Sequence, residues 1–150
     1  LDASFCGIPN EDRAKYTQLL QDNGVNFNYY YRLSHEDMML TYSRSKIGLN
    51  FSKNMNGEEI KTQMKARMFE VPGARSLLLT EYTDGLEQFF EIDKEIVCFT
   101  EPEELLQKVK YLLQNPDLCN TIANNGYQRF LKEHESHVRM NNIIEQIKKI

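Results

Sequence analysis

The sequence predicts an α/β fold in which a doubly wound, mostly parallel sheet of five strands is followed by a helical tail. Three observations predict it. Short strand-like segments alternate with amphipathic helical patterns from residue 3 to residue 100. Two of these segments, "RSLLLT" and "EIVCFT", are continuous apolar runs, which are typical of central parallel strands covered on both faces. After Thr100 the pattern is wholly helical, so the sheet is complete by that point.

The first half of the chain contains three of the predicted strands and two helices. The strands are "ASFCG", "VNFNYYYR" and "KIGLNF", and the last two alternate apolar with more polar residues. Asn10 is a candidate N-cap for the first helix, which Gly24 ends. Ser34, with Asp37 three residues later, resembles a capping box that starts the second helix.

A polar loop, "SKNMNGEE", separates the third strand from the next predicted helix, over residues 61–71. Its Met64, Met68 and Val71 recur at helical spacing, so we expect them to face the core. The segment "YTDGLEQFF", between the last two strands, is interpreted as a turn and a short helix.

The helical tail contains three predicted helices. Thr100 and Glu103 form a candidate capping box for the first of them, and Pro116 suits the first turn of the second. The last helix carries isoleucines at helical spacing, which we expect to be core residues rather than an interface. They are Ile143, Ile144, Ile147 and Ile150.

Length and composition predict a single domain over residues 1–150. A chain of 150 residues can bury one core without disulfides or metal ions. Hydrophobic residues make up 41% and charged residues 27%, which is ordinary for a folded globular domain. The chain opens directly on strand-like sequence at Leu1 rather than on a methionine. We therefore expect a fragment of a longer protein.

Composition also argues against several partners and cofactors. The net charge of −4 offers no basic surface for a nucleic-acid backbone. The three cysteines form no CxxC pair, and His134 and His137 lack further ligands nearby, so we expect no metal site, two solvated histidines and no tightly bound cofactor. No apolar run approaches the ~20 residues of a membrane-spanning helix, and there is no signal-peptide pattern. A cytoplasmic location fits these features best.

The predicted fold indicates where a ligand would bind. In open α/β sheets, ligands lie beyond the carboxyl ends of the strands, where glycine turns and helix N-termini face them. Gly7 follows the first strand and would let a ligand approach the backbone closely. Thr83, Asp84 and Gly85 open the short helix, whose free N–H groups could hold a phosphate. The alternative is that both segments are ordinary turns and caps.

The segment "KARMFE" concentrates charge at the end of the helix that precedes a buried strand. On a helical wheel, Arg67 and Glu70 share one flank, and Lys65 lies on the other. One interpretation is a surface salt bridge between Arg67 and Glu70, which contributes a few tenths of a kcal/mol. The other is that Lys65 or Arg67 binds a pyrophosphate while Glu70, an acceptor only, takes the two hydroxyls of a ribose.

Five segments together carry a family resemblance. They are "FCGIPNEDRAKYTQLL", "YSRSKIGLNFS", "KARMFEVPGARSLLLTEYTDGLEQFF", "EIVCFTEPEELLQKVKYLL" and "RFLKEHESHVRM". In this order they resemble the C-terminal half of CgeB-like, spore-maturation-type glycosyltransferases. The K-x-R-x-F-E-x-P-G segment, followed by L-L-L-T and D-G-L-E, is the most specific part.

The resemblance implies the Rossmann-like, donor-nucleotide domain of a GT-B fold enzyme of the hexosyltransferase type. The substrate would be a nucleoside diphosphate sugar of the UDP or GDP type, and an N-terminal acceptor domain of the same chain would be missing, so that the isolated fragment would be inactive. Glu70 would hold the ribose, and Lys65 and Arg67 would neutralise the diphosphate. The segment "TEYTDGLEQ" would border the donor sugar. Its candidate donor-binding residues are Thr80, Glu81, Thr83, Asp84 and Gly85.

One position departs from the family pattern. Many related enzymes that retain anomeric configuration carry two glutamates separated by seven residues, and the first would stand at Thr62. Glu58 and Glu59 in the preceding loop could substitute, but a polar pair there is more often solvated. No catalytic acid/base pair can therefore be named, and the expected donor of the base is the missing domain.

Two other classes of protein share parts of this pattern. A flavodoxin-like or receiver-like regulatory module has the same five-strand alternation, but a receiver needs an acidic cluster after its first strand, where this chain has Cys6 and Gly7. A non-catalytic assembly module would use the apolar helical tail to dock another domain.

Overall fold

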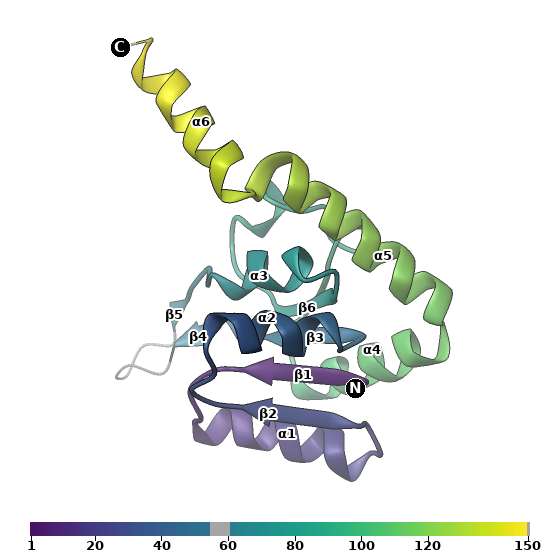
Figure 1. Ribbon diagram of the computed structural model, residues 1–150. Coiled ribbons are helices and arrows are strands. Elements are labelled where there is room, and N and C mark those ends of the chain that lie inside the picture. Colours follow the sequence, from purple (N-terminus) through teal and green to yellow (C-terminus); the bar gives the residue numbers. More distant parts are fainter. Residues whose placement is uncertain (55–60, 150) are drawn as a thin grey trace.

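The structure is a computed structural model that describes residues 1–54 and 61–149 (Figure 1). Its main sheet has five parallel strands in the order β2-β1-β3-β6-β7. The strands are β1 (Ala3–Cys6), β2 (Phe27–Tyr30), β3 (Ile47–Asn50), β6 (Leu77–Glu81) and β7 (Val97–Phe99). The predicted α/β fold class, with five parallel strands and a helical C-terminal segment, is confirmed.

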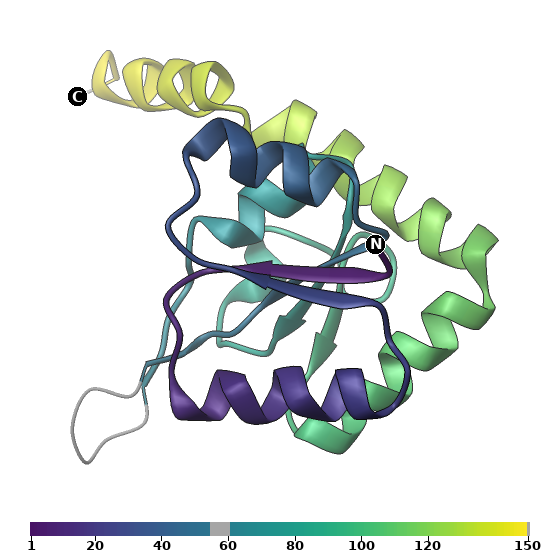
Figure 2. The ribbon, with the colours of Figure 1, turned by 60° about the horizontal axis from the view of Figure 1, so that its bottom comes forward.

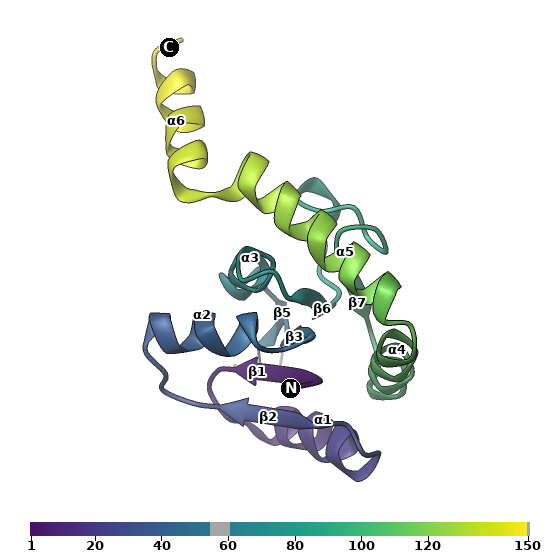
Figure 3. The same ribbon diagram turned by 45° about the vertical axis from the view of Figure 1, so that its right-hand side comes forward.

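Helices cover both faces of the sheet (Figures 2 and 3). One face carries α1 (Glu11–Asp22) and α4 (Pro102–Gln114), and the other carries α2 (His35–Ser43) and α3 (Arg67–Gly73). A fifth helix, α5 (Pro116–Arg129), packs against β6 and α3. Alternate residues of β6 enter different cores, because side chains of a strand point to opposite faces. The continuous apolar run "RSLLLT" is thus explained by burial on both faces.

Three of the predicted helix starts are confirmed. The Asn10 side chain accepts a hydrogen bond from the Arg13 backbone at 2.8 Å, and Ser34 accepts one from the Asp37 backbone. Pro116 is the first residue of α5. The predicted capping box at Thr100 names the wrong partner, because Glu104 takes the place of Glu103. The backbone N–H and hydroxyl of Thr100 donate to the Glu104 carboxylate, because α4 begins only at Pro102 and the fourth residue reaches back instead of the third.

The helix predicted over residues 61–71 begins only at Arg67. Residues Lys61–Thr62 instead form β5, which pairs antiparallel with β4 (Lys53–Asn54). This ribbon and the bond from the Gln63 backbone to Ser52 satisfy backbone groups outside the helix. Met64 therefore precedes the helix and is 37% exposed, against the prediction that it faces the core. Glu58 and Glu59 lie outside the described residues.

The short helix predicted after "YTDG" is a single 3-10 turn, η1 (Leu86–Gln88). Gly85 precedes it with φ of 85°, a left-handed conformation that favours glycine. Burial of Leu86 and Phe90 draws the chain back into the core before a longer helix can form. A helix N-terminus able to hold phosphate is therefore not formed here.

The tail leaves the body of the domain (Figures 1 and 3). A π-helical turn, η2 (Phe130–His134), leads into α6 (Ser136–Ile147). The prediction that Ile143, Ile144 and Ile147 are core residues is wrong, because they are 41–62% exposed; Ile150 lies outside the described residues. Across residues 1–54 and 61–149, no helix has the length and apolar character needed to cross a membrane.

His134, the last residue of η2, and His137 of α6 differ from each other. His137 is exposed, as expected. His134 is only 8% exposed, and its Nε2 donates to the Phe89 carbonyl at 2.8 Å, so the prediction of a solvated side chain is wrong. The ring packs among Phe69, Phe89 and Phe90. This cluster joins the start of the tail to α3.

Candidate functional site

A pocket of about 340 Å³ opens beyond the carboxyl ends of β1 and β2. Its walls come from the turn after β1, the turn after β2 and the residues around the start of α3. We call it the glycine pocket, and its lining residues are Cys6, Gly7, Ile8, Tyr30, Tyr31, Arg32, Leu33, Met38, Lys65, Ala66, Arg67 and Glu70. The fold thus brings Gly7 together with Lys65, Arg67 and Glu70, four residues that the sequence singles out.

Gly7 is the residue around which the charged groups gather. A Cβ atom at this position would lie 2.6 Å from the Phe5 ring and 2.9 Å from Nη2 of Arg67. Its backbone is held by its N–H bond to the Tyr30 carbonyl and by the Tyr29 hydroxyl, which donates to the Gly7 carbonyl at 3.0 Å. Only glycine allows this turn to lie against the guanidinium of Arg67.

Arg67, the first residue of α3, points back toward the sheet. Its Nη1 donates to Oδ1 of Asn50 at 2.9 Å, and its guanidinium stands 4.7 Å from the centre of the Phe5 ring. Burial lowers the pKa of Arg67 below its usual value, but a guanidinium stays charged under physiological conditions. A fixed and partly desolvated positive charge therefore borders the pocket.

Arg13 is a second guanidinium beside the same ring, and the sequence reasoning missed it. It is 8% exposed and lies 5.4 Å from the centre of the Phe5 ring. Its Nη1 donates to the Ile8 carbonyl, while its buried Nε has no hydrogen-bond partner. Arg13 belongs to the first turn of α1, where the helix dipole disfavours a cation. That unfavourable position was the signal that could have found it.

Lys65 completes a group of three cations. Burial lowers its pKa to about 8, and the charges of Arg13 and Arg67 add to the effect. Its Nζ lies 3.4 Å from the Lys53 carbonyl, which it contacts as a donor. We call Arg13, Lys65 and Arg67 the cation group. Mutual repulsion among them is an electrostatic strain that a bound anion would relieve.

Glu70 faces a different part of the pocket. Its Oε1 lies 3.9 Å from Nδ1 of His35, and its side chain is 25% exposed. Among the described residues, Arg67 and Glu70 form no ion pair, because Arg67 turns to Asn50 instead. The interpretation as a surface salt bridge is therefore wrong, and the carboxylate remains open to the pocket.

Thr80 and Glu81 lie behind the cation group, at the end of β6. Thr80 is fully buried, and its hydroxyl accepts from the amide of Asn50 at 3.0 Å. Thr80 does not line the glycine pocket, but its partner Asn50 accepts the hydrogen bond from Arg67. Glu81 is 2% exposed, and its Oε2 accepts from the backbone N–H groups of Ser52 and Lys53 at 2.9 and 2.8 Å.

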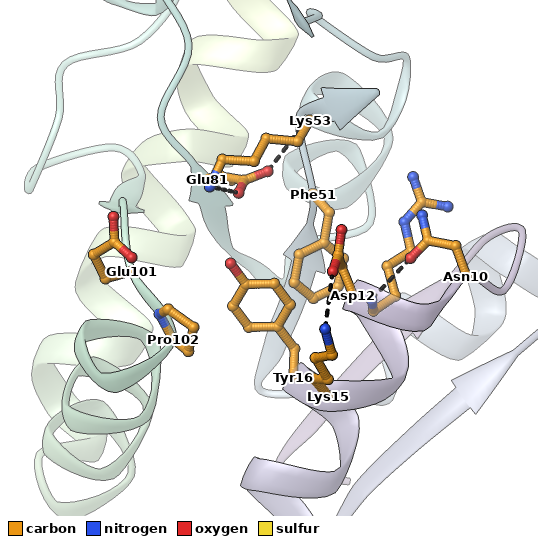
Figure 4. Close-up of a pocket in the computed structure, with 10 residues that line it drawn as sticks. Asn10, Asp12, Lys15, Tyr16, Phe51, Lys53, Glu81, Glu101 and Pro102 are labelled. Carbon is orange, nitrogen blue, oxygen red and sulfur yellow. Dashed lines mark hydrogen bonds and ion pairs between the residues drawn. The ribbon is translucent and has the colours of Figure 1, made fainter. Parts of the chain in front are cut away.

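Glu81 lines a second pocket of about 310 Å³ between the starts of α1 and α4 (Figure 4). We call it the α1–α4 pocket. Its lining residues are Asn10, Asp12, Arg13, Lys15, Tyr16, Phe51, Lys53, Glu81, Glu101 and Pro102. Of the predicted site residues, only Glu81 lies here.

Thr83, Asp84 and Gly85 line neither of these two pockets. Thr83 is 4% exposed, and Asp84 is exposed. Gly85 lies next to the side chain of Met64, the residue before Lys65, because a Cβ on Gly85 would lie 3.2 Å from Cε of Met64. The structure therefore separates this segment from the glycine pocket.

Comparison with known families identifies the chain. A profile described as glycosyl transferase-like matches residues 9–145. The chain belongs to this glycosyl transferase-like family. A search of curated protein sequences finds no match. Membership of this family does not favour the flavodoxin-like or receiver-like alternative. In the described part of the chain, no group of three or more potential metal-binding side chains occurs.

Solved structures of larger proteins contain the same fold. The structure of HepE from Anabaena in complex with UDP superimposes with a TM-score of 0.70 at 13% identity, over 100% of this chain and 41% of its own. Its complex with UDP-glucose gives 0.65 at 12% identity, covering 99% and 40%. Sucrose-phosphate synthase from Thermosynechococcus elongatus gives 0.68 at 12% identity, covering 97% and 38%. The family member described here thus spans about two fifths of these neighbours.

Proposed function

We propose that this chain is the donor-binding domain of a glycosyltransferase, which moves a sugar from a nucleoside diphosphate sugar to an acceptor hydroxyl. The observation that carries the proposal is the cation group around Gly7, with the Glu70 carboxylate on the same pocket. A diphosphate is the ligand that three converging cations and an approachable glycine backbone suit.

Glu70 supplies the second half of this recognition. A carboxylate accepts hydrogen bonds and donates none, so it suits the two neighbouring hydroxyls of a ribose. It lies on the same short helix as Arg67, which fixes the ribose contact relative to the diphosphate contact. We infer a nucleotide of the UDP or GDP type. The neighbouring HepE structures, which are complexes with UDP and UDP-glucose, support UDP as the first candidate.

The cation group also suits the chemistry of the transfer. When the bond between the sugar and the diphosphate breaks, negative charge develops on the leaving diphosphate. Cations that are already fixed and partly desolvated stabilise this charge without reorganising during the reaction. Arg67 is fixed by Asn50 and Arg13 by the Ile8 carbonyl, so both are held before the ligand arrives.

The parent protein is proposed to be a hexosyltransferase in which an N-terminal domain supplies the acceptor site and the catalytic base. The chain spans only about two fifths of the neighbouring structures, which supports a second domain. Thr62 stands where many retaining relatives have a glutamate, and no acid/base residue is assigned within this chain. We keep the cytoplasm as the proposed location, because the three cysteines are free thiols.

The direct test is a calorimetric titration of this chain with UDP, GDP, ADP and CDP. We expect one nucleotide to bind selectively. Arg67→Ala and Glu70→Ala should each weaken its binding about tenfold or more, equivalent to ~1.4 kcal/mol. Each substitution removes one group that contacts the nucleotide and leaves the sheet intact.

Glu36→Ala is the matched control, because Glu36 is an exposed carboxylate on α2 that does not line the glycine pocket. It should bind the nucleotide like the unaltered chain. Circular dichroism melting of all variants checks that they fold. Full affinity in both Arg67→Ala and Glu70→Ala would remove the assignment.

A further inference from the structure

The α1–α4 pocket differs from the glycine pocket in its charge balance. Lys53 pairs with Glu81 at 3.0 Å, and Lys15 pairs with Asp12 at 3.5 Å. Arg13 and Glu101 also line it, so three cations face three carboxylates, and the pocket has no excess of positive charge. Its apolar surface comes from Tyr16, Phe51 and Pro102 (Figure 4). An uncharged ligand with polar edges fits this wall better than a phosphate does.

Several polar atoms of the pocket have unused hydrogen-bonding capacity. Oε1 of Glu81 is paired with the Lys53 ammonium at 3.0 Å, so this atom is satisfied without a ligand. Within the described residues, no hydrogen bond joins the hydroxyl of Tyr16, an 8% exposed residue, or the exposed carboxylate of Glu101 to another residue. Burial and the charges of Glu81 and Glu101 raise the pKa of Tyr16, so its hydroxyl stays protonated and can donate.

The two pockets adjoin through shared residues. Arg13 lines the α1–α4 pocket and stands over the same Phe5 ring as Arg67, which lines the glycine pocket. Lys65, on the wall of the glycine pocket, contacts the carbonyl of Lys53, on the wall of the other. The cation group therefore lies at the boundary between the pockets.

We infer that the α1–α4 pocket binds the sugar of the donor and that the side chains of Tyr16 and Glu101 hydrogen-bond with its hydroxyls. This inference rests on the proposed function, because it places the diphosphate at the cation group and the nucleoside in the glycine pocket. A nucleoside diphosphate sugar consists of a nucleoside, a diphosphate and a sugar in that order. The glycine pocket, the cation group and the α1–α4 pocket lie in the same order. Lys53 and Glu81 form the polar floor beneath the sugar.

The charge pattern decides between the sugar and other ligands. A second phosphate would meet the carboxylates of Glu81 and Glu101, and like charges in a partly buried site repel each other. A purely apolar ligand would bury the Tyr16 hydroxyl without a hydrogen-bond partner. A pyranose offers both hydroxyl donors for the carboxylates and a C–H face for the aromatic rings.

The test compares the affinity for UDP with that for UDP-glucose, UDP-galactose and UDP-N-acetylglucosamine, measured by calorimetry on this chain. We expect at least one sugar nucleotide to bind about threefold or more tightly than UDP, as one or two added hydrogen bonds would give. In Tyr16→Phe and Glu101→Gln this ratio should fall toward one, while the affinity for UDP changes by less than about twofold.

The controls keep the same chemistry outside the pocket. Tyr111→Phe and Glu103→Gln alter exposed residues of α4 that do not line it, and they should keep the ratio of the unaltered chain. The ring resonances of Tyr16, assigned through Tyr16→Phe, should shift on adding the sugar nucleotide and remain in place on adding UDP.

The contrary outcomes separate this inference from the proposed function. If UDP binds but no sugar nucleotide gains affinity over it, or if the gain survives in both variants, the sugar lies elsewhere and only the inference fails. If no nucleotide binds, or if binding ignores Glu70→Ala, the proposed function fails, and the inference fails with it.

Discussion

At the scale of single residues, the unusual feature of this domain is that it keeps like charges together. Arg13 and Arg67 share one aromatic ring, and Lys65 lies close enough to both for their charges to lower its pKa. Cations above an aromatic face gain some attraction from the ring. That attraction does not cancel the mutual repulsion of the cations, so the arrangement is understandable as a preformed anion site.

The pKa of Lys65 gives a prediction on pH. The amine is charged below about pH 8 and loses its proton as the pH rises through that value. A diphosphate is already fully ionised above pH 7.5, so its own charge no longer changes there. Affinity for the nucleotide should therefore be higher at pH 7.5, where most of the amine is charged, and fall severalfold by pH 9.5.

Calorimetry at pH 7.5, 8.5 and 9.5 measures this effect. Lys65→Met should bind more weakly at pH 7.5 and show a flat profile, because the titrating group is gone. Lys132→Met removes an exposed lysine of the η2 turn and should reproduce the profile of the unaltered chain. A slope that persists in Lys65→Met would assign the titration to another group.

At the scale of elements, the tail helix is joined to the site through the cluster around His134. Its ring packs on Phe69, the neighbour of Glu70 in α3, and its Nε2 holds the Phe89 carbonyl. Arg139 of α6 stands 5.0 Å from the centre of the same Phe69 ring. The position of α3, and with it that of Arg67 and Glu70, thus depends on packing from the far end of the chain.

His134 makes the stability of this joint dependent on pH. Burial lowers its pKa below the ordinary value of 6.5, although the Phe89 bond and Glu133 act in the opposite direction, and Arg129 and Arg139 lower it further. The unfolded chain therefore binds a proton more readily than the folded one. The stabilising contribution is complete above pH 6.5 and is lost as the pH falls through the folded pKa.

Urea unfolding at pH 7.5, 6.5 and 5.5 measures this loss. The free energy of unfolding should decrease toward pH 5.5 in the unaltered chain and in His137→Gln, whose histidine is exposed. His134→Gln keeps a side-chain donor near the Phe89 carbonyl and removes the titration, so its decrease should be smaller. Parallel decreases in all three proteins would mean that His134 does not control the effect.

Sequence periodicity predicted the elements that are long or buried on both faces, and it failed where short segments depend on distant partners. The strand "RSLLLT" and the caps Asn10 and Ser34 are local features, so they could be read directly. Lys61–Thr62 pairs with Lys53–Asn54, and the helical spacing of the methionines that follow gave no indication of this pairing.

The candidate site was predicted in part for a similar reason. Gly7, Lys65, Arg67 and Glu70 do meet, because Gly7 follows β1 and the start of α3 follows β3 through the β4–β5 ribbon. The carboxyl ends of these parallel strands share one edge of the sheet. Arg13 was missed because a single arginine within a polar helix start carries no periodic signal. Asn50 was missed because its role, which is to hold Arg67, exists only after folding.

At the scale of the whole molecule, both pockets open beyond the carboxyl ends of the strands, and in the isolated domain one side of the site faces solvent. Under the proposed function, water there would weaken every interaction with the charge that develops on the leaving diphosphate. Closing a cleft between two domains excludes that water and completes the catalytic groups. The chain should therefore bind a sugar nucleotide and leave it intact.

Incubating the chain with the best-binding sugar nucleotide, with and without simple alcohol and sugar acceptors, tests this expectation. Release of the nucleoside diphosphate, followed by chromatography, should stay at the rate of a protein-free control. The same assay on the longer parent protein should give transfer that Glu70→Ala abolishes or strongly reduces. Turnover by the isolated chain would mean that the catalytic base lies within these 150 residues, and Glu81 and Glu101 would be the first carboxylates to replace.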